Sequence, residues 1–330
     1  MEKINRINNP RVTKEYSDNI PIQEARKSLL RSGYLLEARL ENILLKNDYY
    51  VQSNYVYPDP ESNKPREIDL DAILAIDIKP RKLEYIFLEL IIECINNNQP
   101  LAFITKEPPF RDYQSFEIKM LGRPETISKT RNSKILLSIP EYLKMKDYHH
   151  YFKGSVATQY CTFDLKQKGP NKGEWRAYHH DDHHESLVKL CQALEYSKLD
   201  FEEEFDYRID NSLNIQFFYP LLVVQNDILD VRQIEKKIII NKTNHIKFNV
   251  KDFVKGEEIG YIIDVIKEDF FPDYLKIVKK EMDETAQLLN KKYPTIHHEL
   301  QKQARKAKIG KTIKIISSLM GKQLINVEKT

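Results

Sequence analysis

Glycine and cysteine are scarce in this chain of 330 residues. Nine glycines argue against a glycine-rich loop that cradles a nucleotide phosphate. The three cysteines, Cys94, Cys161 and Cys191, form no C-x-x-C pair, which argues against a disulfide framework or a zinc ribbon. The apolar stretch Ile86–Ile92 is interrupted by Glu89, and no apolar run approaches the ~18 residues that span a bilayer. Because the N-terminus also lacks an apolar core, we expect a cytoplasmic protein with reduced thiols and no membrane attachment.

An excess of one charge is also nearly absent, since 52 Lys and Arg face 49 Asp and Glu. The net charge of +3 does not by itself indicate a nucleic-acid binder. The distribution is uneven, however, because residues 291–330 carry ten Lys and Arg against two Glu. Such a basic tail fits either a phosphate-binding arm or the solvated face of a terminal helix. For an arm, the candidate nucleic-acid contacts are Arg305, Lys306, Lys308, Lys311 and Lys314.

Polar, periodic and apolar segments follow one another in an order that predicts an α/β protein with a central mixed sheet. Apolar residues at 36, 40, 43 and 44 form a helical stripe, and the strand candidates 67–75 and 83–95 read as an antiparallel hairpin. We expect four parts: a polar arm (1–20), a core (21–165), an α/β extension packed on the core (166–290) and a basic helical tail (291–330). The other expected elements are strands at 49–57, 100–105, 159–166, 174–178, 217–224, 245–250 and 261–266, and helices at 184–196 and 271–290.

Carboxylates gather on the predicted hairpin. Strand alternation places Asp69 and Asp71 on one face of the first strand, and Glu89 and Glu93 on one face of the second. In a paired hairpin Asp69 and Glu93 approach each other, and two such carboxylates repel unless a hard cation neutralises them. Mg²⁺ accepts a sparse carboxylate cage and leaves positions for water and phosphate, which suits phosphodiester hydrolysis. The alternative is the solvated face of an ordinary hairpin, which produces the same alternation.

Three segments in this order resemble the PD-(D/E)xK nuclease superfamily, most closely its restriction-endonuclease-like and Holliday-junction-resolvase-like branches. They are Gly33-x-x-x-Glu37, Arg66-Glu67-Ile68-Asp69-Leu70 and Phe87-Leu88-Glu89-Leu90-Ile91-Ile92-Glu93-Cys94. The ordered set favours the metal site over the solvated face.

This resemblance, which covers about residues 25–105 closely, implies a restriction-endonuclease-like core. It implies that Asp69 and Glu93 bind Mg²⁺ or Mn²⁺ and that the backbone carbonyl of Cys94 is a third ligand. It also implies that Glu37 supports the site. Asp59, in the literal Pro-Asp dipeptide, lies in a proline-rich loop well before the strand and is not the motif residue.

The chain departs from the family where the motif requires a lysine, because Ile95 stands there. An isoleucine offers neither the charge nor the hydrogen bond that stabilises negative charge developing on a phosphate. Three interpretations stay open: a lysine from elsewhere substitutes, the fold is kept as an inactive nuclease, or the residue is a disabling substitution. Lys82 and Lys106 are the nearest substitutes in the sequence.

The run His179-His180-Asp181-Asp182-His183-His184 contains two pairs of histidines at a spacing that binds zinc on a helix. It also stands where a helix begins, and Asp181 or Asp182 suits the N-cap position there. We prefer the cap.

The function we expect is a Mg²⁺-dependent endonuclease that hydrolyses DNA, in the setting of bacterial anti-phage defence or repair. A homodimer or a protein partner fits this setting. The alternative is a catalytically inactive nuclease-fold module that binds nucleic acid or regulates a protein partner.

Overall fold

The computed structural model describes residues 19–31, 34–59, 62–79, 82–107, 118–129, 134–167, 172–204, 212–254 and 257–305. The expectations for most of the N-terminal arm, for Gly33 and for Lys306, Lys308, Lys311 and Lys314 lie outside these residues. None of the helices within the described ranges is both long and apolar enough to cross a membrane.

The first third of the chain confirms the predicted order of helix, strand and hairpin. Helices α1 (Ile22–Arg31) and α2 (Tyr34–Leu45) precede the strands β1 (Tyr50–Pro58), β2 (Pro65–Lys79), β3 (Glu84–Ile95) and β4 (Leu101–Lys106). Both β1 and β3 pair antiparallel with β2. The apolar stripe of α2 is buried against the sheet at Leu36, Leu40 and Leu44.

The remaining chain adds strands to the same sheet, one separate two-stranded sheet, and one long helix to each face of the large sheet. These elements are β5 (Met120–Gly122), β6 (Ile127–Ser128), β7 (Leu136–Leu137), α3 (Ile139–Leu143), η3 (Met145–Asp147), η4 (His150–Phe152), β8 (Val156–Leu165), β9 (Trp175–Tyr178), α4 (Asp181–Glu204), β10 (Ile215–Val224), β11 (Ile228–Ile234), β12 (Lys237–Thr243), β13 (His245–Val254), β14 (Glu257–Lys267), η5 (Glu268–Phe270) and α5 (Phe271–Lys291). Residues 293–305 continue as a helix.

Within the described residues, twelve strands form one mixed sheet, whose main path runs β1-β2-β3-β10-β14-β13-β8-β4-β11-β12. Strand β10 is parallel to both β3 and β14, whereas β13 and β14 are antiparallel. The boundary expected at 165/166 falls at the end of β8, and strands from both sides of it lie next to each other in the sheet. The protein is therefore an α/β protein with a large mixed sheet flanked by helices.

Strand β10 crosses the centre of the sheet and is buried along its whole length. It contains Pro220, although proline has no N–H to donate and is rare in central strands. On the edge away from β3, β10 pairs with β5 up to Phe217 and with β14 only from Leu221 onward. Pro220 therefore lies in the gap between these two neighbours, where no sheet hydrogen bond is lost.

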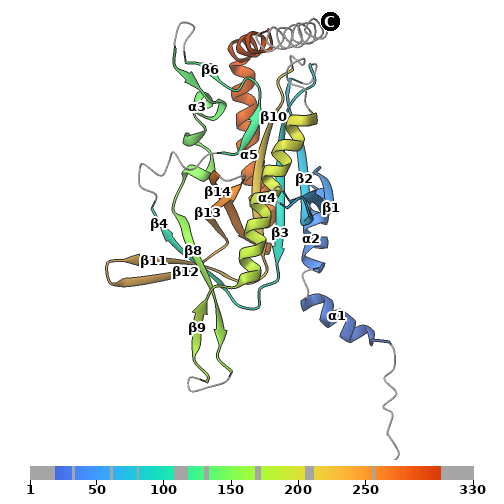
Figure 1. Cartoon of the computed structure of the whole chain (residues 1–330), viewed down its shortest axis with the longest axis vertical. Coiled ribbons are helices and arrows are strands. Elements are labelled where there is room, and N and C mark those ends of the chain that lie inside the picture. Colours follow the sequence, from blue (N-terminus) through green and yellow to red (C-terminus); the bar gives the residue numbers. More distant parts are fainter. Residues whose placement is uncertain are drawn as a thin grey trace, which may run out of the picture.

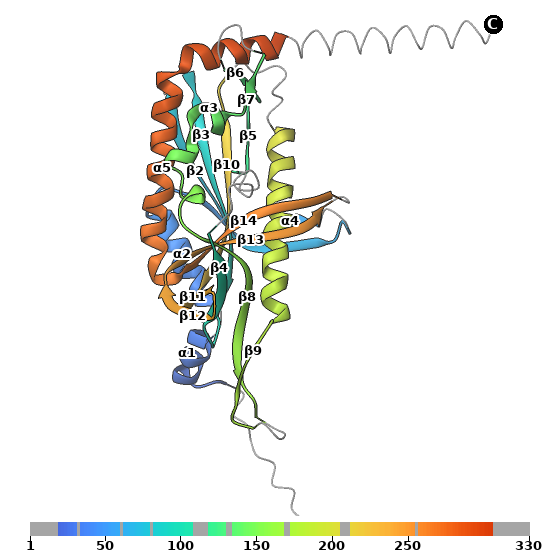
Figure 2. The same cartoon turned by 90° about the vertical axis from the view of Figure 1, so that its left-hand side faces the viewer.

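Two apolar cores lie on opposite faces of the sheet, as Figure 2 shows by the positions of α5 and α4 on its two sides. The core under α2 and α5 includes Leu40 and Val278, and the core under α4 includes Leu190 and Phe218. The hairpins β8–β9 and β11–β12 project from the sheet (Figure 1). The sheet thus presents the ends of β2 and β3 between two helical layers.

Candidate functional site

The candidate site lies where β2 and β3 separate. Their backbone pairing runs from Lys79 opposite Glu84 to Leu70 opposite Ile92, and β2 then continues alone with β1. Beyond Leu70 and Ile92 the two strands no longer pair through their backbones. There the Asp69 side chain bridges them, because its Oδ2 atom accepts a hydrogen bond from the backbone N–H of Cys94 at 2.7 Å. The first predicted metal ligand is thus held against the strand that carries the second.

Three carboxylates share this fork: Glu37 from α2, Asp69 from β2 and Glu93 from β3. We call this group the acidic site. Glu93 is only 3% exposed, and burial together with the nearby Asp69 carboxylate raises its pKa to about 8. Burial also raises the pKa of Asp69, against the lowering effect of the Cys94 N–H. The pKa of Glu37 is raised by burial and by Asp69. The acidic site is short of positive charge.

One lysine approaches the acidic site, and it comes from α4. Lys189 Nζ lies 3.9 Å from Glu93 Oε2, and its charge lowers the pKa of both Glu93 and Asp69. The helix turn that carries Lys189 is tied to the sheet, because the Tyr57 hydroxyl donates to the Lys189 carbonyl at 3.1 Å. Sequence reasoning missed Lys189. No sequence pattern indicates it, because the contact depends on how α4 packs on the sheet.

The two substitutes expected from the sequence lie elsewhere. Lys82 is at the opposite end of β3 from Glu93, where its Nζ donates to the Tyr293 hydroxyl at 3.1 Å. Lys106 ends β4, and four strands separate β4 from β3 along the sheet. The prediction that one of them lies beside Glu93 is therefore wrong. The β2–β3 hairpin and the path from β3 to β4 carry residues that are close in sequence to distant parts of the sheet.

Ile95, at the lysine position of the motif, is 7% exposed and belongs to the apolar core under α4. Its side chain fills space between the sheet and that helix.

Glu37 is positioned by a long-range ion pair two residues further along α2. Arg39 binds Glu268 through two atoms, with Nε 2.5 Å from Oε1 and Nη2 3.0 Å from Oε2. Because Glu268 directly follows β14, at the same end of the sheet as Glu93, this pair fixes α2 against that end. Asp59, which the sequence analysis set aside, serves the loop before β2, where it accepts hydrogen bonds from Ser62 N–H and Arg66 Nε.

A second pair of buried acids lies one step along the same strands. Asp71 and Glu89 are 7% and 2% exposed, and Gln216 Nε2 donates to Glu89 Oε2. Burial raises the pKa of Asp71 to about 7 and that of Glu89 well above its usual range. Two such carboxyls in contact share a proton near neutral pH. Strand alternation predicted that these four carboxylates share one face of the hairpin. In the structure they form two pairs, Asp69 with Glu93 and Asp71 with Glu89.

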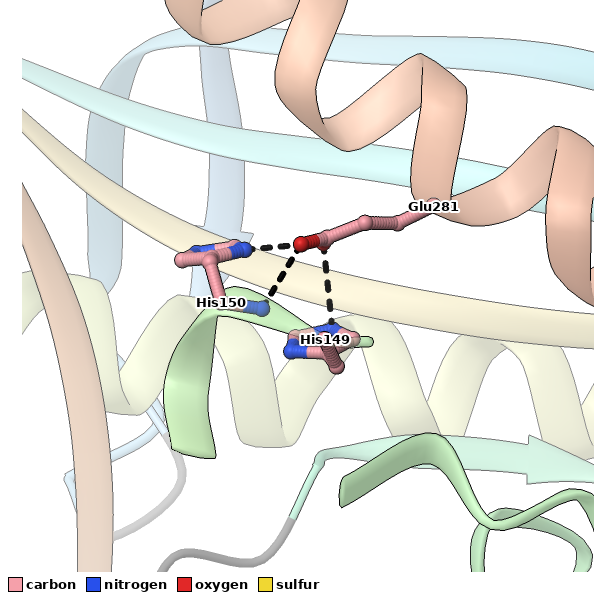
Figure 3. Close-up of side chains that lie close together, drawn as sticks. All are labelled: His149, His150 and Glu281. Atoms are coloured by element: carbon pink, nitrogen blue, oxygen red, sulfur yellow. Dashed lines mark hydrogen bonds and ion pairs between the residues drawn. The ribbon is translucent and has the colours of Figure 1, made fainter. Parts of the chain in front are cut away.

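A third group, which the sequence did not predict, lies under α5 (Figure 3). His149 and His150 come from the turn at η4, and Glu281 reaches them from α5; His150 is shared with a neighbouring group that adds His245 and Asp264. We call these five residues the His–carboxylate cluster. In each of the two groups the ligand atoms lie within 4.8 Å of one another, which is close enough to hold a metal ion.

Hydrogen bonds already occupy the ring nitrogens of His150. Its Nδ1 atom is 2.8 Å from Glu281 Oε2, and its Nε2 atom is 3.0 Å from Asp264 Oδ2. The two carboxylates raise the pKa of His150 to about 9 despite its burial. Burial instead lowers the pKa of His149, whose Nε2 contacts the Tyr219 hydroxyl at 2.8 Å. The cluster therefore holds an imidazolium between two carboxylates, and it joins α5 to the sheet.

The run of histidines at 179–184 lies at the start of α4, which begins at Asp181. His179 and His180 precede the helix, so the zinc spacing is not presented on one helical face. Neither of the two possible metal-binding groups within the described ranges includes these histidines. Arg305, the described member of the predicted basic contacts, is an exposed residue on the terminal helix.

A comparison of the chain with protein-family models, with curated proteins and with solved structures gives no match in any of the three.

Proposed function

We propose that the chain is a divalent-cation-dependent nuclease of the PD-(D/E)xK type, which hydrolyses DNA at the acidic site. The resemblance of the three sequence segments suggested this function. The geometry supports it, because an acid from the first helix, an acid from one strand and an acid from the next strand lie at one fork of the sheet.

One observation carries the proposal. Glu93 Oε1 is buried and has no hydrogen-bond partner among the residues that the structure describes. A buried carboxylate oxygen without a partner is costly, and such an atom beside two further carboxylates has the chemistry of an incomplete cation site. Asp69 and Glu93 would hold Mg²⁺ or Mn²⁺, and the Cys94 carbonyl remains the predicted third ligand. When bound, the ion supplies Lewis-acid stabilisation and a more acidic water.

Lys189 and Glu37 supply the charge stabilisation and the proton transfer that the reaction needs. Lys189 places a fixed positive charge beside Glu93, where it stabilises negative charge that develops on the phosphate. Glu37, with its raised pKa, is suited to accept a proton from the attacking water. Lys189 thus fills the role that Ile95 cannot.

The proposal is tested by cleavage of supercoiled plasmid and single-stranded DNA with Mg²⁺ or Mn²⁺. The variants are Asp69→Asn and Glu93→Gln, with Asp77→Asn as the control because Asp77 is an exposed acid on the same strand as Asp69. We expect cutting by the wild type and by Asp77→Asn, and a loss of at least about 100-fold in the other two. Equal cutting by all variants contradicts the assignment of catalysis to the acidic site. No cutting by the wild type contradicts the proposal and favours the inactive binding module.

A further inference from the structure

A cavity of about 420 Å³ opens beside the acidic site. Its walls come from the segment that follows β3, from β8 and from the junction of β9 with α4, which meet at the lower end of α4 in Figure 1. The lining residues are Cys94, Ile95, Asn96, Asn97, Asn98, Gln99, Thr162, Phe163, Tyr178, His180, His183 and Ser186. We call it the β3–α4 cavity.

Two residues connect this cavity to the acidic site. Cys94 lines the cavity and donates its backbone N–H to Asp69. Ser186 also lines it, and its side chain hydrogen bonds to Glu93. A ligand in the cavity is therefore in contact with residues that touch both predicted metal ligands.

Aromatic rings form one side of the β3–α4 cavity. The rings of Tyr178 and His180 have centroids 5.8 Å apart, and those of His180 and His183 are stacked with centroids 4.7 Å apart. Flat rings of this kind stack on nucleic-acid bases in a way that tolerates any sequence.

Side-chain amides form another side. Asn97 is buried and fixes the loop, because it donates to the Gln99 carbonyl at 2.7 Å and accepts the Asn226 N–H at 3.0 Å. The neighbouring Asn98 is exposed. An amide carries both a donor and an acceptor, which matches the edges of unpaired bases.

The size of the cavity limits what can enter. Its volume lies near the lower end of the roughly 300–1,000 Å³ range of small-ligand sites, so it is too small for a base-paired duplex. A base offers its flat faces and its hydrogen-bonding edge to such walls only when it is unpaired or displaced from its stack.

We propose that the β3–α4 cavity holds one unpaired nucleotide of the DNA substrate. This inference rests on the proposed nuclease function and names its substrate class: single-stranded DNA or a displaced single-stranded segment. A base stacks on the Tyr178 ring, and the side-chain amide of Asn98 contacts the hydrogen-bonding edge of that base. The adjoining phosphate lies toward Lys189 and the acidic site.

Binding of labelled DNA to the full chain tests the inference, with Ca²⁺ in place of Mg²⁺ so that binding is measured apart from cleavage. The probes are a single-stranded oligonucleotide of about 16 nucleotides and its blunt duplex, each carrying one fluorescent base analogue whose emission falls on stacking. Tyr178→Ala removes the ring and Tyr178→Phe keeps it. Tyr50→Ala is the control, because Tyr50 is 63% exposed at the distant start of β1.

We expect the single strand to bind at least about tenfold more tightly than the duplex, with quenching of the analogue, and Tyr178→Ala to lose about tenfold in affinity. Tyr178→Phe and Tyr50→Ala should bind as the wild type does. Equal affinities for the two probes, or unchanged single-strand binding by Tyr178→Ala, overturn the inference. If cleavage still depends on Asp69 in that case, the nuclease proposal stands. If the wild type does not cleave DNA at all, both the nuclease proposal and this inference are contradicted.

Discussion

Lys189 Nζ lies 3.9 Å from Glu93 Oε2, and this pair joins helix α4 to the strand that carries the predicted metal ligand. We propose that this lysine, 96 residues after Glu93 in the chain, supplies the positive charge that β3 lacks. A buried carboxylate with two acidic neighbours needs such a cation. Within the described part of the chain, Glu93 Oε1 has no hydrogen-bond partner, and this is where we expect a divalent ion.

Replacement of Lys189 tests its catalytic role. Lys189→Met should lower kcat for DNA cleavage by about 10²–10³-fold at saturating Mn²⁺, because it removes charge stabilisation of the phosphate. Cleavage kinetics with purified protein measure this effect.

Lys198→Met provides the matched control. Lys198 lies on the same helix, is similarly exposed at 26% and pairs with Glu195 away from the acidic site. A similar kcat for the two variants would show that Lys189 is not the catalytic cation.

Substitution at the motif position should not create a better enzyme. Ile95→Lys places an ammonium group in the apolar core under α4, and we expect the free energy of unfolding to fall by about 2 kcal/mol or more. Chemical denaturation measures this loss, with the volume-conserving Ile95→Leu as the comparison. A stable Ile95→Lys protein with increased cleavage would instead mean that the site lacks a cation.

The His–carboxylate cluster predicts a specific dependence of stability on pH. Because the pKa of His150 rises from about 6.5 in the unfolded chain to about 9 in the fold, its protonated form stabilises the fold fully below about pH 6.5. This contribution, about 3 kcal/mol, is lost as the pH rises through 9. Asp264 acts in the opposite direction: its lowered pKa stabilises the fold above about pH 4, and the effect disappears in acid.

Urea unfolding between pH 6 and 10 checks this prediction. His150→Asn should cost about 3–5 kcal/mol near pH 6, since it leaves buried carboxylates without a partner, and the cost should shrink at pH 10. The exposed His298 supplies the control, His298→Asn, for which we expect little change. A cost for His150→Asn that is independent of pH would argue against the imidazolium.

Cation binding should itself depend on pH. Below the pKa of about 8, Glu93 must release a proton before it can bind an ion. The affinity for Mg²⁺ should therefore rise by about tenfold per pH unit between pH 6 and 8 and level off above. Calorimetry in two buffers of different ionisation enthalpy should detect close to one proton released at pH 7. An affinity that does not change with pH would show that Glu93 is not a ligand.

The hairpin β2–β3 was predictable because its information is local. Alternation fixed which side chains share a face, and the turn near Lys79 fixed the antiparallel pairing that brings Asp69 toward Glu93. The continuous apolar run of β10 was equally clear, since a strand buried on both faces has no alternation to show.

The missed features depend on contacts between distant segments. Lys189 meets Glu93 only because α4 crosses the sheet face, and His150 meets Glu281 across 131 positions of sequence. Neither periodicity nor spacing indicates such contacts, because tertiary packing alone creates them. The local hairpin β11–β12 was missed for another reason, since its exposed Ile238–Ile240 follow one another rather than alternate.

The central claim is that Asp69 and Glu93 form a divalent-cation site. Calorimetric titration of Mn²⁺ into the full chain at pH 8 to 8.5 tests this claim, and it needs no DNA substrate. We predict one ion bound by the wild type and by Asp77→Asn, and none at this site in Asp69→Asn or Glu93→Gln. Equal binding by all four proteins, or no binding by the wild type, would contradict the account.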